Sequence, residues 1–249
     1  MKIVLTVSLF FYMVCDIFLG IKLIKPTRIL VIKRRVCMST KFTAFFDEWA
    51  ETYDNSINGE NLQYREVFKN YHYILNTVSK SSFGNILEFG VGTGNLSGKL
   101  LDMGYNVTGV EPSKVMAEKA LQKYPSLDLH EGDFLNFPDI THPIHTIVST
   151  YAFHHITDRE KEKAITKYAK LLSPHGKIIF ADTIFETEEH KTNMIEKAVE
   201  QNYLNLATDL QSEYYTTIPV LNLIFNKAGF HVVFEKMNDF VWLMLAVKK

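Results

Sequence analysis

Short apolar runs alternate with amphipathic segments over most of the chain, and this alternation is typical of a doubly wound α/β domain. Five runs are predicted to be parallel strands, and they lie at 85–89, 106–110, 127–129, 145–150 and 177–182. Two later runs are close enough to pair as an antiparallel ribbon, and they lie at 230–235 and 240–247. The pattern therefore predicts a mostly parallel seven-stranded sheet with an antiparallel C-terminal ribbon at one edge.

Helical periodicity fills most of the intervals between these strands. Helices that connect the parallel strands are expected near 95–103, 113–123 and 159–172. Further helices are expected outside these crossovers, near 43–55, 60–79, 187–211 and 217–228. The segment 187–211 is longer than a helix needs to be in order to connect two neighbouring strands.

Residues 1–37 do not follow this pattern. An apolar run from Ile3 to Ile24 precedes a basic cluster, and the block holds seven of the 27 Lys and Arg residues but one of the 28 Asp and Glu. The run is long enough to span a bilayer, with the basic cluster keeping the following domain cytoplasmic. A cleaved signal peptide is disfavoured because no small-residue cleavage site follows the run. We favour a third interpretation, in which Met38 is the true start and 38–249 is the domain.

The composition of residues 38–249 suits one enzyme domain. Acidic residues exceed basic ones there and no basic stripe occurs, which argues against nucleic acid as the main partner. No cysteine follows Cys37, consistent with a reducing, cytoplasmic location. We expect a small-molecule substrate, and membrane association only if residues 1–37 are genuine. The sequence does not predict the oligomeric state.

The most informative motif joins the first strand to the helix after it. The segment Ile86–Asn95 reads Ile-Leu-Glu-Phe-Gly-Val-Gly-Thr-Gly-Asn, and the second strand leads to an acid, Glu111. Gly90, Gly92 and Gly94 let the backbone turn sharply and let a ligand approach where a Cβ would collide. An acid at this separation is typical of a carboxylate that binds ribose hydroxyls. The motif predicts a site for a nucleoside-containing cofactor.

The spacing and a third acid indicate which cofactor. A dinucleotide site requires Gly-x-Gly-x-x-Gly, because the pyrophosphate lies on the helix N-terminus, whereas this chain has Gly-x-Gly-x-Gly. Asp133 follows the third strand, where its carboxylate would accept from an adenine amine with Phe134 against the ring face. Together these motifs resemble the class I S-adenosylmethionine (SAM) dependent methyltransferases. An NAD-dependent oxidoreductase and a non-catalytic module that binds SAM or S-adenosylhomocysteine (SAH) are the alternatives.

Segments outside these motifs also resemble a known family. Segments 46–54, 87–96, 149–155 and 238–242 resemble the YrrT family of bacterial SAM-dependent methyltransferases, and the likeness extends from about residue 43 to residue 247. The resemblance implies the class I methyltransferase fold and SAM binding through the residues Gly90, Glu111 and Asp133. One departure is Val91, which stands where proline is expected in the glycine loop. The resemblance implies no particular methyl acceptor.

Other residues have both a functional and a structural interpretation. Glu88, inside the first strand, either orients the glycine loop, meets the methionine amino group of the cofactor, or makes a structural hydrogen bond. His154 follows the fourth strand with His155, and it either contacts substrate or takes its proton. Otherwise the two histidines pack and cap the helix that starts at Asp158. Tyr53 either contacts cofactor or substrate or packs against Trp49. No metal is expected, since no Cys cluster or His-x-Glu pattern occurs.

The methyl group of a sulfonium is already activated, so a methyltransferase mainly has to align the reactants and exclude water. The absence of a catalytic triad therefore does not argue against catalysis. We expect the acceptor to enter under the segments 43–80 and 187–215. Four tyrosines are candidate walls of its pocket: Tyr64, Tyr151, Tyr214 and Tyr215.

Overall fold

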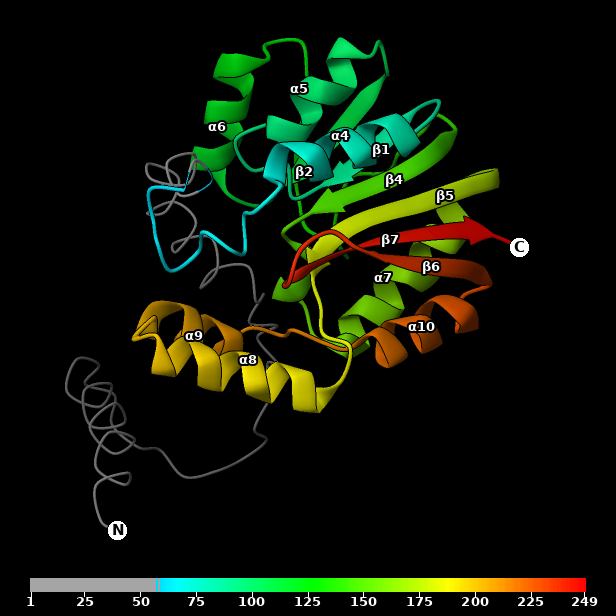
Figure 1. The fold of residues 1–249 in the computed structure, drawn as a ribbon. Coiled ribbons are helices and arrows are strands. Elements are labelled where there is room, and N and C mark those ends of the chain that lie inside the picture. The colour runs from blue at the N-terminus through cyan, green and yellow to red at the C-terminus, as the bar shows by residue number, and fades with distance from the viewer. Residues whose placement is uncertain (1–56, 58) are drawn as a thin grey trace, which may run out of the picture. The chain divides into compact units, whose positions relative to one another are not determined.

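The computed structural model describes residue 57 and residues 59–249, which are coloured in Figure 1. The expected helix at 43–55, Tyr53 and the whole of residues 1–37 lie outside the described residues. Over the described part of the chain, we find no helix with both the length and the apolar character needed to cross a bilayer.

Seven strands form one sheet in the order β3-β2-β1-β4-β5-β7-β6. The strands are β1 (Ile86–Phe89), β2 (Val107–Glu111), β3 (Asp128–Glu131), β4 (Ile144–Thr150), β5 (Leu172–Thr183), β6 (Phe230–Lys236) and β7 (Val241–Lys248). Strands β1 to β5 pair in parallel, and β7 pairs antiparallel with both β5 and β6. The mostly parallel sheet with an antiparallel C-terminal ribbon is therefore confirmed.

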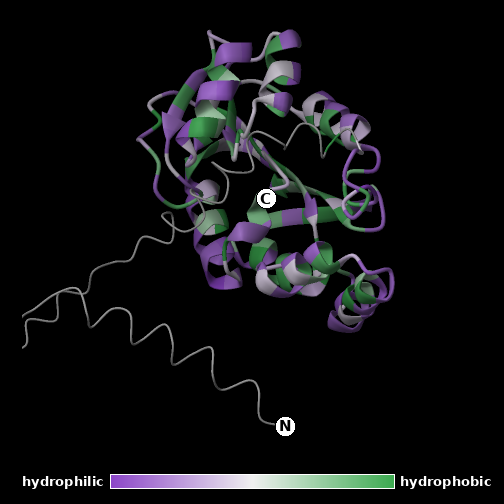
Figure 2. Cartoon of the chain, turned by 90° about the vertical axis from the view of Figure 1, so that its left-hand side faces the viewer, coloured by the Kyte–Doolittle hydropathy of each residue, from purple (hydrophilic) through white to green (hydrophobic). Residues whose placement is uncertain are grey.

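Helices cover both faces of this sheet. In the described residues they are α4 (Tyr71–Ser81), α5 (Asn95–Asp102), α6 (Lys114–Lys123), α7 (Asp158–Leu171), α8 (Glu188–Glu200), α9 (Leu204–Ser212) and α10 (Ile218–Lys227). Ile86 packs in a core cluster with α4 and α5, whereas its neighbour Leu87 packs in another with α7 and α10. Successive side chains of a strand point to opposite faces, so both faces of β1 are buried. Figure 2 shows the resulting mixture of hydrophilic and hydrophobic residues along the helices.

Three predicted elements have different bounds in the structure. The helix expected at 60–79 begins only at Tyr71, because Asn70 has a φ of 65°, which a right-handed helix cannot contain. The helix expected at 187–211 is two helices, α8 and α9, with Asn202 at a φ of 59° between them. The strand expected at 177–182 extends back to Leu172, with an irregular register opposite β4.

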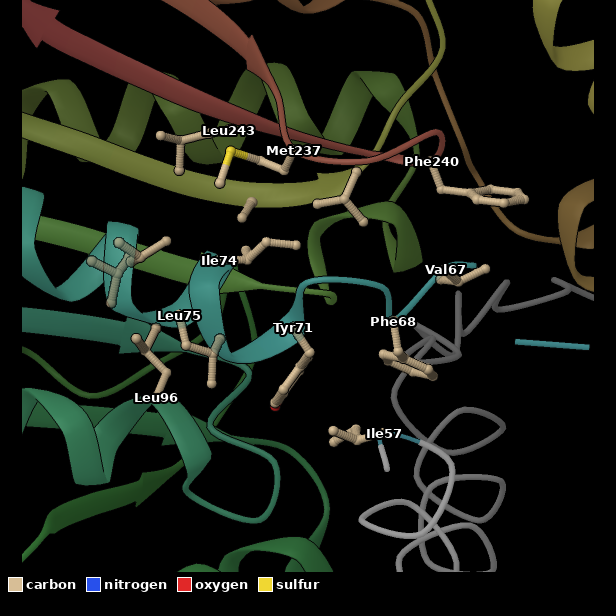
Figure 3. Close-up of a cluster of buried hydrophobic side chains, with 14 of the residues drawn as sticks. Ile57, Val67, Phe68, Tyr71, Ile74, Leu75, Leu96, Met237, Phe240 and Leu243 are labelled. Atoms are coloured by element: carbon tan, nitrogen blue, oxygen red, sulfur yellow. The ribbon is translucent and has the colours of Figure 1, made fainter. Parts of the chain in front are cut away.

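One hydrophobic cluster joins segments that are far apart in the sequence (Figure 3). Val67 and Phe68, ahead of α4, pack in the same cluster as Met237 and Phe240 at the turn between β6 and β7. Asn238 holds this arrangement with its side-chain amide. Its Nδ2 donates to the carbonyl oxygens of Val67 (3.1 Å) and Lys69 (2.8 Å), and its Oδ1 accepts from the backbone N–H groups of residues 240 (2.8 Å) and 241 (2.7 Å).

We predict that Asn238→Ala lowers the free energy of unfolding by about 1–3 kcal/mol, because buried backbone groups lose their partners. The comparison is made by urea denaturation, with Asn193→Ala on the exposed face of α8 as the matched control. Equal midpoints and slopes for Asn238→Ala and the wild-type protein would contradict this role.

Candidate active site

The glycine loop after β1 has the backbone that its composition predicts. Gly90, Gly92 and Gly94 have φ values of 68°, 57° and 85°, a region that other residues rarely adopt. A Cβ added at Gly90 would lie 2.6 Å from the Cβ of Ala152, so this glycine allows close packing against the loop after β4. A Cβ added at Gly92 would meet no atom within 4 Å. The loop is therefore packed at its start and open at Gly92, where a ligand can approach.

Glu111, the last residue of β2, is bonded to this loop. One of its carboxylate oxygens accepts from the N–H of Gly92 and the other from the N–H of Ser113, both at 2.8 Å. Ser113 in turn caps α6, since its hydroxyl oxygen accepts from the N–H of Met116. Glu111 thus joins the glycine loop to the start of the next helix, and its side chain is almost fully buried.

Glu88 lies in the middle of β1 and is also buried. Its Oε2 accepts a hydrogen bond of 2.6 Å from the hydroxyl of Ser97 on α5, which ties the strand to the helix that follows the loop. Burial, with a contribution from the negative charge of Glu111, raises the pKa of Glu88 to about 8, although the Ser97 bond opposes this. Glu88 is therefore mostly protonated at pH 7, and its predicted contact with the cofactor stays a prediction.

Asp133 and Phe134 follow β3 but have different surroundings. The Oδ1 atom of Asp133 accepts from the N–H groups of Leu135 and Asn136, both at 2.8 Å, which shapes the loop. Phe134 is 7% exposed, and its ring centroid lies 5.5 Å from that of Phe89. The sequence suggested that this ring meets an adenine face, whereas the structure places it in the core beneath the loop.

A cavity of about 390 Å³ lies beside the ends of β4 and β5. Its walls come from the segment before α4, the loop after β4, α9 and the residues that follow α9. Of the tyrosines expected as walls, Tyr64, Tyr151 and Tyr215 line it, and Tyr214 is not among the lining residues in the described part of the chain. Three hydrogen-bonded pairs of polar side chains each contribute at least one residue to its lining.

The first pair joins His154 to Asp182, the acid near the end of β5. The Nδ1 atom of His154 lies 2.6 Å from Oδ1 of Asp182, whose Oδ2 accepts from the backbone N–H of His154 at 2.9 Å. Burial favours the protonated carboxyl, yet His154 holds the pKa of Asp182 below its ordinary value. The bond assigns a proton to Nδ1 and leaves Nε2, which has no partner among the described residues, as an acceptor.

The second pair joins His155 to Glu213. The Nδ1 atom of His155 lies 3.1 Å from Oε2 of Glu213. Burial and the proximity of His154 lower the pKa of His155, although Glu213 opposes this. The two imidazoles lie 4.0 Å apart between centroids, each with its own carboxylate. In the part of the chain that the structure describes, no group of three or more potential ligands is arranged to hold a metal ion.

The third pair joins α9 to the segment before α4. The hydroxyl of Tyr64 donates to Oδ2 of Asp209, and the amide oxygen of Gln63 accepts from the N–H groups of Asn205 (3.0 Å) and Leu206 (3.4 Å). Gln63 thus accepts from two backbone N–H groups of the first turn of α9, which have no partner within the helix. The N-cap residue of α9 makes no side-chain hydrogen bond. Partners such as Asp182, Asp209 and Glu213 were not identified from the sequence, although the position of Asp182 at a strand end was an available signal.

The raised pKa of Glu88 predicts a pH dependence of stability. Between the unfolded value of 4.5 and the folded value of about 8, the native state holds a proton that the unfolded state has lost, so unfolding free energy falls as pH rises. Glu88→Gln should flatten this decline when urea unfolding is measured from pH 5 to pH 8. Glu200→Gln, at the exposed end of α8, is the control. An unchanged slope in Glu88→Gln would show that Glu88 ionises normally.

The reversal of strand order at β1, the glycine loop beside it and the acid at the end of β2 define a nucleotide-binding type of α/β fold. Magnesium protoporphyrin IX methyltransferase from Synechocystis, solved with bound SAH, shares this fold with a TM-score of 0.64 at 16% identity, over 84% of this chain and 99% of that one. Human N-acetylserotonin methyltransferase, solved with SAM, shares it with a TM-score of 0.59 at 19% identity, over 83% of this chain and 58% of that one.

Closer relatives specify the family. Residues 86–176 match the model of a methyltransferase domain. An uncharacterised methyltransferase of Bacillus cytotoxicus is 54% identical over 213 residues, which are 85% of this chain and 100% of the relative. A similar protein of Bacillus mycoides is 53% identical over the same length, with the same coverage of both chains. The chain belongs to this family of methyltransferases.

Proposed function

We propose that this methyltransferase transfers the methyl group of SAM to a small acceptor in the cavity beside β4 and β5, leaving SAH. One observation carries the proposal: the glycine loop with Glu111 and the cavity with His154 follow adjacent strands of one sheet. The carboxyl ends of parallel strands lie at one edge, so a cofactor at β1 and β2 is next to an acceptor at β4 and β5. Structural neighbours solved with SAM or SAH support the same choice of cofactor.

The residues at β1, β2 and β3 fit SAM. Gly92 presents open space, and Gly90 and Gly94 shape the loop around it. The bonds of Glu111 to the backbone N–H groups of residues 92 and 113 hold its carboxylate at the end of β2, where it would accept from ribose hydroxyls. Asp133 is the proposed partner of the adenine amine, and we assign Glu88 and Phe134 to supporting the loop from the core.

His154 is the proposed general base. When bound, SAM supplies a methyl group already activated by its sulfonium. The Nε2 atom of His154 would accept the proton of an acceptor hydroxyl or amine, and Asp182 would stabilise the resulting imidazolium. General-base catalysis typically contributes about 10²–10⁴-fold, and alignment in a closed site can contribute about 7–11 kcal/mol.

We place the domain at residues 38–249 and propose a cytoplasmic location with no nucleic-acid partner. The 213 residues matched by the relatives support this extent, and the absence of cysteine after Cys37 supports the location. The role of Tyr53, as a contact to cofactor or substrate, stays a prediction because this residue lies outside the described part of the chain.

Calorimetric titration of the full chain with SAM, SAH and NAD tests the cofactor. We expect saturable binding of SAM and SAH, with dissociation constants on the order of micromolar, and no heat from NAD. Glu111→Gln should weaken SAM binding about tenfold or more, because an amide oxygen cannot replace both carboxylate oxygens. Glu118→Gln, exposed on α6, is the matched control. Binding of NAD, or unchanged SAM affinity in a folded Glu111→Gln, would contradict the assignment.

Turnover tests the role of His154. SAH release from SAM is measured with a panel of phenols, amines and aliphatic hydroxyl compounds, and kcat is determined for those that support it. His154→Gln should lower kcat about 10²–10⁴-fold while SAH affinity, measured by calorimetry, stays unchanged. Asp182→Asn should lower kcat as well, since the imidazole loses its charged partner. Cofactor binding with no turnover of any acceptor would favour the non-catalytic module.

A further inference from the structure

The lining of the acceptor cavity indicates the charge of the molecule that it binds. We propose that the acceptor is an organic cation, an amine with an apolar or aromatic body, whose ammonium group binds Asp209 and Glu213. This inference rests on the proposed function of the cavity as the acceptor site, and it specifies the class of acceptor that the fold alone leaves open.

Both carboxylates have one oxygen engaged and one available. Oδ2 of Asp209 accepts from Tyr64, and Oε2 of Glu213 is paired with Nδ1 of His155. The other oxygen of each carboxylate has no hydrogen bond within the described part of the chain, and neither oxygen is among the buried atoms that lack a partner. Both residues line the cavity.

Among the described residues that line the cavity, none is lysine or arginine. Burial and His154 lower the pKa of His155, which favours its neutral form. The ammonium groups of Lys161 and Lys191 lie behind the wall, where they donate to the carbonyl oxygens of Tyr214 (2.6 Å) and Tyr215 (3.2 Å), and neither lysine lines the cavity. A carboxylate or phosphate ligand would therefore be repelled.

The remaining walls suit an organic amine. Aromatic rings line much of the cavity, and they belong to Tyr64, Phe68, Tyr151, Tyr215 and Phe240. Aromatic faces attract cations, with the strongest effect at sites that exclude water. An apolar body would occupy the space between these rings while the ammonium group meets the carboxylates.

Tyr151 gives an independent indication that a ligand belongs here. Its hydroxyl oxygen is buried and has no hydrogen-bond partner among the described residues. Its backbone has a φ of 54°, which is uncommon for a residue with a large side chain. Strained backbone and unsatisfied polar groups concentrate at functional sites, where a ligand supplies the missing bond. Tyr151 lines the cavity, so a bound acceptor would pack against this strained residue.

Two probes with the same phenol and opposite charges test the proposal. Tyramine carries an ammonium group, and 3-(4-hydroxyphenyl)propionate carries a carboxylate. Each is titrated into the full chain saturated with SAH, and binding is followed by calorimetry. We expect tyramine to bind at least about tenfold more tightly than the carboxylate probe. The double variant Asp209→Asn/Glu213→Gln should lose this preference and keep its SAH affinity.

Glu196→Gln removes one negative charge from the exposed face of α8, outside the cavity lining, and should keep the preference. Equal binding of the probes, tighter binding of the carboxylate, or no saturable binding of tyramine at millimolar concentration would overturn the proposal. A preference that persists in the double variant would overturn the assignment to Asp209 and Glu213. Failure of SAH itself to bind the wild-type chain would remove the proposed function as well.

Discussion

The parallel alignment of β1, β2, β4 and β5 is the constraint on which every part of the site depends. Because these strands run in one direction, the loops after them all emerge at the same edge of the sheet. The glycine loop, Glu111, the two adjacent histidines and Asp182 lie at or beyond strand ends for this reason. A register shift of one residue in β2 or β5 would turn the side chain of Glu111 or Asp182 to the opposite face.

Two buried glutamates near the glycine loop have different hydrogen-bond partners and therefore different structural roles. Glu88 is surrounded by the core and bonded to Ser97, and burial keeps it mostly protonated near neutral pH. Glu111 is at the strand end, where both of its oxygens meet backbone N–H groups. Glu88 therefore ties β1 to α5, whereas Glu111 shapes the glycine loop. The difference comes from the hydrogen-bond donors that surround each carboxyl group.

The cofactor half of the site could be predicted from the sequence because its signals are local. Three glycines after an apolar strand, and an acid at the end of the next, require no knowledge of distant contacts. The pairs around the cavity could not be predicted in the same way, since they join residues 145 positions apart (Tyr64 and Asp209) or 58 apart (His155 and Glu213). The break between α8 and α9 was also missed, because the helical pattern is continuous in the sequence and only Asn202, with a φ of 59°, interrupts it. These errors matter, because α9 supplies one wall of the cavity.

The adjacent histidines gain different properties from their partners. Their rings are 4.0 Å apart, so a proton on one disfavours a proton on the other. Asp182 is fully buried beside His154 and stays ionised, which stabilises a proton gained there. Burial and the neighbouring His154 lower the pKa of His155, which favours its neutral form, and its Nδ1 holds Glu213 in place. Under the proposed function, a proton taken from an acceptor would go to His154, while His155 holds Glu213 at the cavity wall.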